Sequence, residues 1–237
     1  MHAALAYFTI LPVGSGEAPD ARALAWLPFV GALTGALSGG AAYALAAVVP
    51  HGLAVAAAFA ATIVLSGAIH LDGFLDGCDA FFASTTPERR LEILKDPRHG
   101  TFALAGLAVV VVVWLAAFAP LRPAAYAPAL ALAGAASRWS AVAYATFVPD
   151  ARTAAPNRAL ATRLPWPLLA AGFVLTAALA VPFGLRGAVA FAVALILASG
   201  CVLWVRARLG GGLVGDAYGF AIVVAETGAL VALGGTT

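Results

Sequence analysis

Charged residues are scarce in this chain. Of its 237 residues only 10% are Asp, Glu, Lys or Arg, whereas 63% are hydrophobic, and the mean hydropathy is +0.98. Soluble domains carry about 25% charged residues, so this composition indicates a protein of the lipid bilayer. The net charge of +2 provides no basic face of the kind that binds nucleic acid.

Cysteine is also scarce. Cys78 and Cys201 are the only two, and no C-x-x-C pair exists, so neither a disulfide framework nor a zinc site is predicted. The G-x-S-x-G, H-E-x-x-H and Walker A patterns are absent, which removes three common enzyme classes. Residues 1–13 are apolar but short and lack a basic leading region. We expect them to lie at the membrane interface or to re-enter it, not to form a cleaved signal peptide.

The long apolar runs predict one all-α domain over residues 1–237, a polytopic membrane bundle of about seven helices at about 20 residues each. We expect spans near residues 24–49, 53–69, 101–119, 124–148, 164–183, 188–205 and 213–233. In the first span Gly31, Gly35 and Gly39 form a stripe that lets a neighbouring helix approach closely.

The distribution of Lys and Arg between the spans predicts the orientation. With the N-terminus in the cytoplasm, ten cations fall in inside segments, including Arg152, Arg158 and Arg163, whereas only Arg122 and Arg186 fall outside. This topology brings the segments 70–100, 150–163 and 210–216 to the cytoplasmic face. Most of the polar chemistry therefore converges on one side of the membrane.

Residues 70–100 hold six of the eleven acidic residues of the chain. Asp72, Asp76 and Asp79 follow a D-x3-D-x2-D spacing, so all three share one face of a helix. Their mutual repulsion at a membrane boundary favours a divalent cation between them, although a solvated helix end with Asp72 as its N-cap is the alternative. The spacing excludes an EF-hand calcium loop and suits Mg²⁺, and Gly73 leaves room for a phosphate beside the ligands.

The second half of this segment predicts a helix that begins after Thr86, with Pro87 at its first position. Lys95 and Arg98 are candidates to bind a diphosphate, because the chain returns to the membrane beside the acid cluster. Asp96 is a candidate fourth metal ligand or base. Pro97 places Asp96 at a break in the helix.

Two further groups are candidates for the same site. Arg138 lies inside an expected span, where it needs a partner, and we prefer a phosphate or the acid cluster to a purely structural pair. Gly211 and Gly212 belong to a glycine-rich stretch that opens a helix and can cradle phosphate, with Asp216 at the entrance of the span. His70 and His99 bracket the acidic segment, and each is interpreted as a hydrogen-bonding or boundary residue.

Three motifs in these segments resemble the cobalamin synthase family, the adenosylcobinamide-GDP ribazoletransferases. They are the H-L-D-G-F-L-D-G-C-D stretch from His70 to Asp79, the K-D-P-R-H-G stretch from Lys95 to Gly100, and the G-G-L-V-G-D stretch from Gly211 to Asp216. Ala80, Pro97, Ala103 and Val214 depart from the family pattern, but no carboxylate is lost. We count His70 among the substrate-binding candidates with Gly73, Arg98, Arg138, Gly211, Gly212 and Asp216.

The resemblance implies an enzyme of the bacterial inner membrane that joins adenosylcobinamide-GDP to α-ribazole, or to its 5′-phosphate, and releases GMP. Mg²⁺ on Asp72, Asp76, Asp79 and Asp96 would be its cofactor, with Lys95 among the catalytic residues. Membrane lipid would surround the protein, and a homo-oligomer is left open. A CDP-alcohol phosphotransferase of lipid synthesis and a cation transporter are the alternatives, although the first lacks its D-x3-D-x3-D pattern here and the second its internal repeat.

Overall fold

The computed structural model describes residues 1–14, 20–146, 148, 151 and 164–235, and these form helices and turns without a β-strand. Arg152, Arg158 and Arg163 lie outside the described residues. The α-helices are α1 His2–Phe8, α2 Ala21–Ala25, α3 Leu27–Leu45, α4 His51–Leu65, α5 Ile69–Phe82, α6 Pro87–Ile93, α7 Thr101–Phe118, α8 Tyr126–Val142, α9 Trp166–Ala180, α10 Leu185–Arg208 and α11 Gly215–Gly234.

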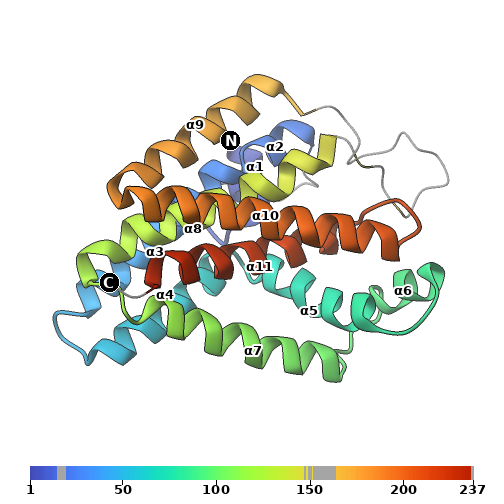
Figure 1. Cartoon of the computed structure of the whole chain (residues 1–237), viewed down its shortest axis with the longest axis horizontal. Helices are drawn as coiled ribbons and strands as arrows, with labels where there is room; N and C mark the ends of the chain where they lie inside the picture. The colour runs from blue at the N-terminus through green and yellow to red at the C-terminus, as the bar shows by residue number, and fades with distance from the viewer. Residues whose placement is uncertain (15–19, 147, 149–150, 152–163, 236–237) are drawn as a thin grey trace.

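Helices α8 and α11 form the centre of the bundle. Helix α11 packs against α10, α5, α8 and α7, and α8 packs against α3, α10 and α9 (Figure 1). Most residues of α8 are buried, including both serines and the arginine near its end. The two central helices therefore place their polar side chains in the interior of the protein.

The glycine stripe of α3 packs closely against another helix, as the sequence predicts, and the structure identifies this helix as α8. A Cβ atom at Gly35 would overlap the backbone carbonyl of Leu130, and one at Gly31 would overlap the carbonyl of Gly134. Only glycine permits this backbone approach, which brings the two helices together along several turns.

A sharp bend separates α4 from α5. The axes of the two helices differ by 90°, whereas the sequence predicts a span that runs straight into the acidic segment. Gly67 and Ala68 both have left-handed backbone conformations, with φ of 58° and 57°, which ends α4. Left-handed geometry costs a non-glycine residue about 1–2 kcal/mol, so surrounding contacts must hold Ala68 in place. The backbone N–H of Ile10 donates to the carbonyl of Leu65 just before the bend.

The helices are consistent with a polytopic membrane bundle. Four of them are long and apolar enough to cross a bilayer: Thr101–Phe118, Trp166–Phe183, Leu185–Arg208 and Gly215–Gly234; the bent pair α4–α5 would make a fifth. Helices α3 and α8 occupy two other expected spans. The expected number of about seven and the cytoplasmic N-terminus are not confirmed by these helices and stay predictions.

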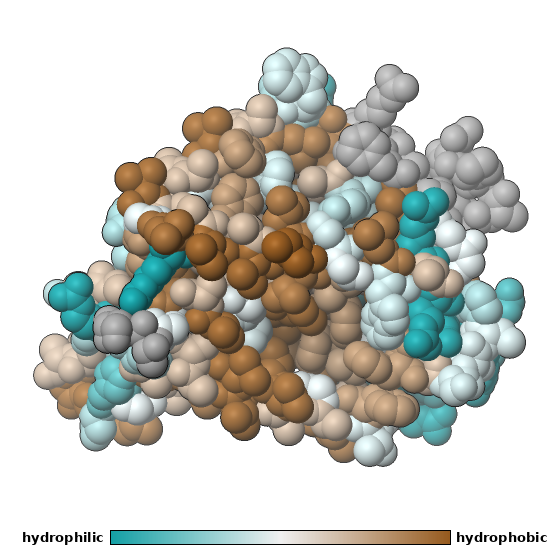
Figure 2. Space-filling model, viewed as in Figure 1, coloured by the Kyte–Doolittle hydropathy of each residue, from teal (hydrophilic) through white to brown (hydrophobic). Residues whose placement is uncertain are grey.

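Polar residues gather at the two ends of the molecule. In the view of Figure 2 apolar surface covers the middle of the bundle, and hydrophilic residues lie at the left and at the right; the right end is where Figure 1 places α6 and the end of α5. This end carries the acidic segment.

Candidate functional site

The acid cluster lies on α5, and its helical geometry is confirmed. Asp72 is exposed, and Asp76 and Asp79 are partly buried. The other side of α5 buries Phe74 and Cys78 in the core. The alternation of apolar and acidic residues thus directs the three carboxylates away from the packed interior.

Asp79 binds the start of the next span. Its two carboxylate oxygens accept hydrogen bonds from the backbone N–H groups of Gly100 and Ala103, the latter at 3.1 Å. These N–H groups belong to the first turn of α7, which has no partner for them within its own helix. Asp79 therefore caps α7 and joins the second motif to the first.

His99 brings a second contact between these two motifs. Its Nδ1 atom lies 3.5 Å from Oδ1 of Asp76, and one donor atom from each of Asp72, Asp76 and His99 lies within 4.8 Å of the others. It is the only group of three potential metal-binding side chains found among the described residues. Asp79 and Asp96 are not members of this group.

Asp96 is paired with Arg98. The guanidinium donates from Nε and NH2 to the two carboxylate oxygens, at 2.9 and 2.8 Å, and the backbone N–H of Arg98 donates at 3.0 Å. These hydrogen bonds from Arg98 lower the pKa of Asp96 to about 2. Metal binding by Asp96 and phosphate binding by Arg98 both stay predictions.

The start of α6 agrees with the prediction from the sequence. The Thr86 hydroxyl accepts the N–H of Arg89 and caps α6, with Pro87 at the first position. Lys95 follows the end of α6, and its side chain is exposed without an ion pair to any described residue. A pocket of about 360 Å³ lies between α6 and the start of α7 and is lined by residues that include Asp79, Asp96 and Arg98, but not by Lys95.

The third motif meets the first where α11 crosses α5. A Cβ atom at Gly73 would lie 3.1 Å from Cα of Asp216 and 3.3 Å from Cα of Gly219. Asp76 lies close enough to Asp216 and Asp72 to experience their negative charges. Because Gly73 has no side chain, α5 and α11 pack closely at this position. Asp216 on α11 adds a carboxylate to the cluster.

The two predicted phosphate-binding glycines have structural contacts. Gly211 adopts φ of 111°, and its N–H donates to the carbonyl of Arg206 at 2.9 Å. A Cβ atom at Gly212 would contact the backbone of Ala151, whose N–H donates to the carbonyl of Leu213. Their use for phosphate is an untested prediction.

Arg138 and His70 lie deeper in the bundle. The Arg138 guanidinium donates to the Glu226 carboxylate at 2.5 Å and to the Gly134 carbonyl at 3.2 Å, with 4% and 10% of the two charged side chains exposed. His70 is buried, stacks on Phe8, and lines with Arg138 and Glu226 a cavity of about 50 Å³. Phosphate binding by these two residues stays a prediction.

Glu226 is not among the site residues predicted from the sequence. It is the one acidic residue in the apolar interior of α11, as Arg138 is the one basic residue in α8. Isolated opposite charges in two membrane-spanning segments are expected to pair, and this signal was sufficient to find it.

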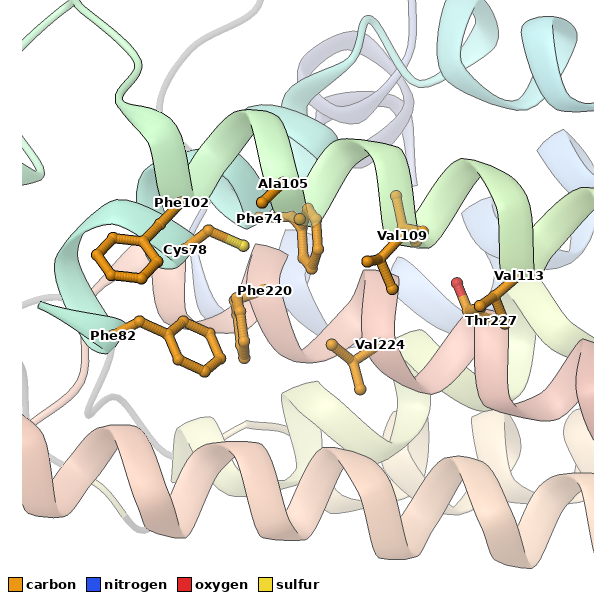
Figure 3. Close-up of a pocket in the computed structure, with 12 residues that line it drawn as sticks. Phe74, Cys78, Phe82, Phe102, Ala105, Val109, Val113, Phe220, Val224 and Thr227 are labelled. Atoms are coloured by element: carbon orange, nitrogen blue, oxygen red, sulfur yellow. The ribbon is translucent and has the colours of Figure 1, made fainter.

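An apolar groove runs beside the acid cluster. It has a volume of about 420 Å³ between α5, α7 and α11, and Figure 3 shows the side chains that point into it, among them Phe74, Phe102, Val109 and Phe220. Almost no polar surface lines it, so it supplies no ligand for a metal or a phosphate.

The donor set of the cluster fits a divalent cation. Asp72 and Asp76 offer two carboxylates near the surface, where water and a substrate phosphate have access. Mg²⁺ favours one or two protein carboxylates completed by water and phosphate oxygens. The residues present are therefore compatible with the metal that the sequence analysis expects.

Fold and site together define a polytopic helical membrane protein with a carboxylate cluster at one end of its bundle. Residues 1–234 match the family model of cobalamin-5-phosphate synthase, and the chain belongs to this family. No solved structure matches it.

Curated relatives carry the name adenosylcobinamide-GDP ribazoletransferase. The protein from Deinococcus radiodurans is 37% identical over 95% of this chain and 82% of its own length. The one from Ralstonia nicotianae is 38% identical, with 94% and 90% covered, and the one from Pseudomonas paraeruginosa is 35% identical, with 97% and 95% covered. The family resemblance that the three motifs predict is therefore confirmed.

Proposed function

We propose that this chain catalyses the final joining step of cobalamin synthesis. Adenosylcobinamide-GDP reacts with α-ribazole, or its 5′-phosphate, to give adenosylcobalamin, or its 5′-phosphate, and GMP. The names of the relatives support this reaction. The observation that supports this proposal most directly is that the three motifs are in contact. The contacts are Asp79–Gly100, Asp76–His99 and Gly73–Asp216.

In the proposed reaction a ribazole hydroxyl oxygen bonds to the phosphorus on the cobinamide side of the diphosphate. The bond from this phosphorus to the bridging oxygen breaks, GMP leaves with that oxygen, and the hydroxyl proton passes to a carboxylate of the cluster. A bound Mg²⁺ would neutralise the charge that develops on the phosphates.

The residues of the cluster have separate tasks in this proposal. Asp72 and Asp76 hold the metal, because neither accepts a backbone hydrogen bond in the described structure. Lys95 is exposed nearby and supplies a positive charge to the diphosphate. Asp79 acts on the site through α7, since both of its oxygens already accept N–H groups.

We place this site at the cytoplasmic face of a bacterial inner membrane. The apolar helices support a membrane-spanning protein, and the relatives are bacterial. Both substrates are polar, phosphorylated or nucleoside-like molecules, which agrees with a site at a polar end of the bundle.

The test is product analysis with protein purified in detergent. With both substrates and Mg²⁺, the expected result is a ribazole-containing corrinoid and GMP in equal amounts, with none after chelation of divalent ions. Asp72→Asn and Asp76→Asn should each reduce turnover at least ~100-fold. Asp20→Asn is the matched control, because Asp20 caps α2, far from the acid cluster in the chain, and asparagine caps equally well.

The same assay tests the alternatives. A CDP-alcohol phosphotransferase would release CMP from a CDP-alcohol, and a cation transporter would release no nucleotide. Wild-type protein that yields neither corrinoid product nor GMP would refute the proposed reaction.

A further inference from the structure

The backbone on either side of His99 is held by hydrogen bonds to carboxylates. The preceding residue, Arg98, donates its N–H to Asp96, and the following residue, Gly100, donates its N–H to Asp79. The first bond is local to the turn, and the second holds the main chain beside His99 against α5. Its side chain remains 38% exposed, so the imidazole is free to turn toward an ion at the surface.

The carboxylates around His99 are not equally available. Asp79 uses both oxygens to cap α7, and Asp96 uses both to bind Arg98. Asp72 and Asp76 remain, and His99 is the side chain that completes a set of three donors with them.

We propose that His99 is the third protein ligand of the divalent cation, together with Asp72 and Asp76. This rests on the metal requirement of the proposed function. Neighbouring ligand atoms on an octahedral ion of this kind lie about 3 Å apart, because each sits at about 2.1 Å from the metal. The Asp76–His99 distance of 3.5 Å is close to this value. The donor atoms of the whole set lie within 4.8 Å, and side-chain rotation at the exposed Asp72 and His99 can bring them closer.

A nitrogen ligand changes which metal the site prefers. Mg²⁺ favours oxygen ligands, whereas imidazole suits transition metals, and affinity at mixed nitrogen and oxygen sites rises from Mn²⁺ onward along the first row. The set of two carboxylates and one imidazole should therefore bind Mn²⁺ more tightly than Mg²⁺. His99→Gln should weaken Mn²⁺ binding by about tenfold or more and Mg²⁺ binding by less, because the lost nitrogen favours Mn²⁺.

Electron paramagnetic resonance on purified, tag-free protein with Mn²⁺ tests the ligand directly. The titration gives the dissociation constant, and electron spin-echo modulation detects a nitrogen bound to the ion. The wild type should show nitrogen modulation that His99→Gln loses. His51→Gln is the matched control, because His51 binds the Ala119 carbonyl and Tyr126 at the other end of α7 and should not alter the signal.

The outcomes separate the two proposals. Tight Mn²⁺ binding without nitrogen modulation in the wild type would overturn the role of His99 and leave the metal site of the proposed function intact. Modulation that persists in His99→Gln would overturn it as well. Absence of both Mn²⁺ and Mg²⁺ binding would overturn the metal site and His99 together.

Discussion

The buried pair between Arg138 and Glu226 leads to a prediction about stability. Each residue is the charged partner of the other inside the bundle, and their side chains are 4% and 10% exposed. Arg138→Met would leave the Glu226 carboxylate without its cation, and Glu226→Met would leave the guanidinium without its anion. The double variant removes both charges and fills much of the same volume with apolar atoms.

The expected magnitudes follow from the burial of the pair. Removal of one partner from a buried ion pair typically costs about 3–5 kcal/mol, whereas replacement of both by apolar side chains is often neutral or stabilising. For a chain of this size the loss corresponds to a fall in melting temperature on the order of 10 °C. The hydrogen bond from Arg138 to Gly134 adds to the cost of Arg138→Met.

The chain contains its own reporter for this experiment. Cys78 is buried and Cys201 is partly buried, so a fluorogenic thiol dye reports thermal unfolding in detergent. Arg89→Met is the control for loss of an ion pair, because Arg89 and Glu92 are 64% and 61% exposed and such pairs contribute at most about 1 kcal/mol. The control should melt near the wild type.

Two results would refute this reasoning. If the single variants have the melting temperature of the wild type, the pair is not buried as described. If the double variant is no more stable than the single variants, the two charges do not compensate each other. Turnover of a stable double variant then decides the predicted substrate role of Arg138. Full activity excludes that role, and a loss of about 100-fold or more supports it.

Five other predictions follow from the site and the helices that support it. Asp79→Asn should lower the melting temperature with and without metal, because an amide cannot accept both N–H groups of α7; a temperature equal to the wild type would contradict the cap. Asp72→Asn should melt like the wild type in chelator but lose the stabilisation by added Mg²⁺; a retained shift would exclude it as a ligand. Lys95→Gln should lower turnover with unchanged topology, and Lys95→Arg should restore only part of it; full activity would leave Lys95 with no part in the reaction. Gly35→Leu should prevent folding, because its side chain would enter the α8 backbone; normal extraction and melting would contradict the close approach. A cysteine at position 122 should react with reagents outside the cell, and one at position 85 should not; the reverse would overturn the orientation.

The sequence was sufficient to predict features that depend on neighbouring residues in the chain. The helix of Asp72, Asp76 and Asp79 follows from their spacing, and the Thr86 cap follows from a local pattern of hydroxyl and proline. The stripe from Gly31 predicted close packing, although the sequence did not identify α8 as the partner.

The partners of single residues were not predictable in the same way. Asp79 was expected to bind a metal, but its distance from Gly100 along the chain conceals that α7 begins beside it. The 90° bend at Gly67 and Ala68 was missed because alanine rarely adopts left-handed geometry and carries no local signal for it. Since the metal, substrate and cap roles all use the same residue types, only the three-dimensional contacts distinguish them.

These contacts explain how the protein can keep so many carboxylates at one end of an apolar bundle. The N–H groups of α7 compensate Asp79, and Arg98 compensates Asp96. Asp72 is exposed and has neither a hydrogen-bond donor nor an ion pair among the described residues. The uncompensated negative charge is therefore concentrated at Asp72 and Asp76, which is the position where a divalent cation would relieve the most repulsion. The charges that serve the fold are already neutralised, and the charges that remain are those assigned to the proposed reaction.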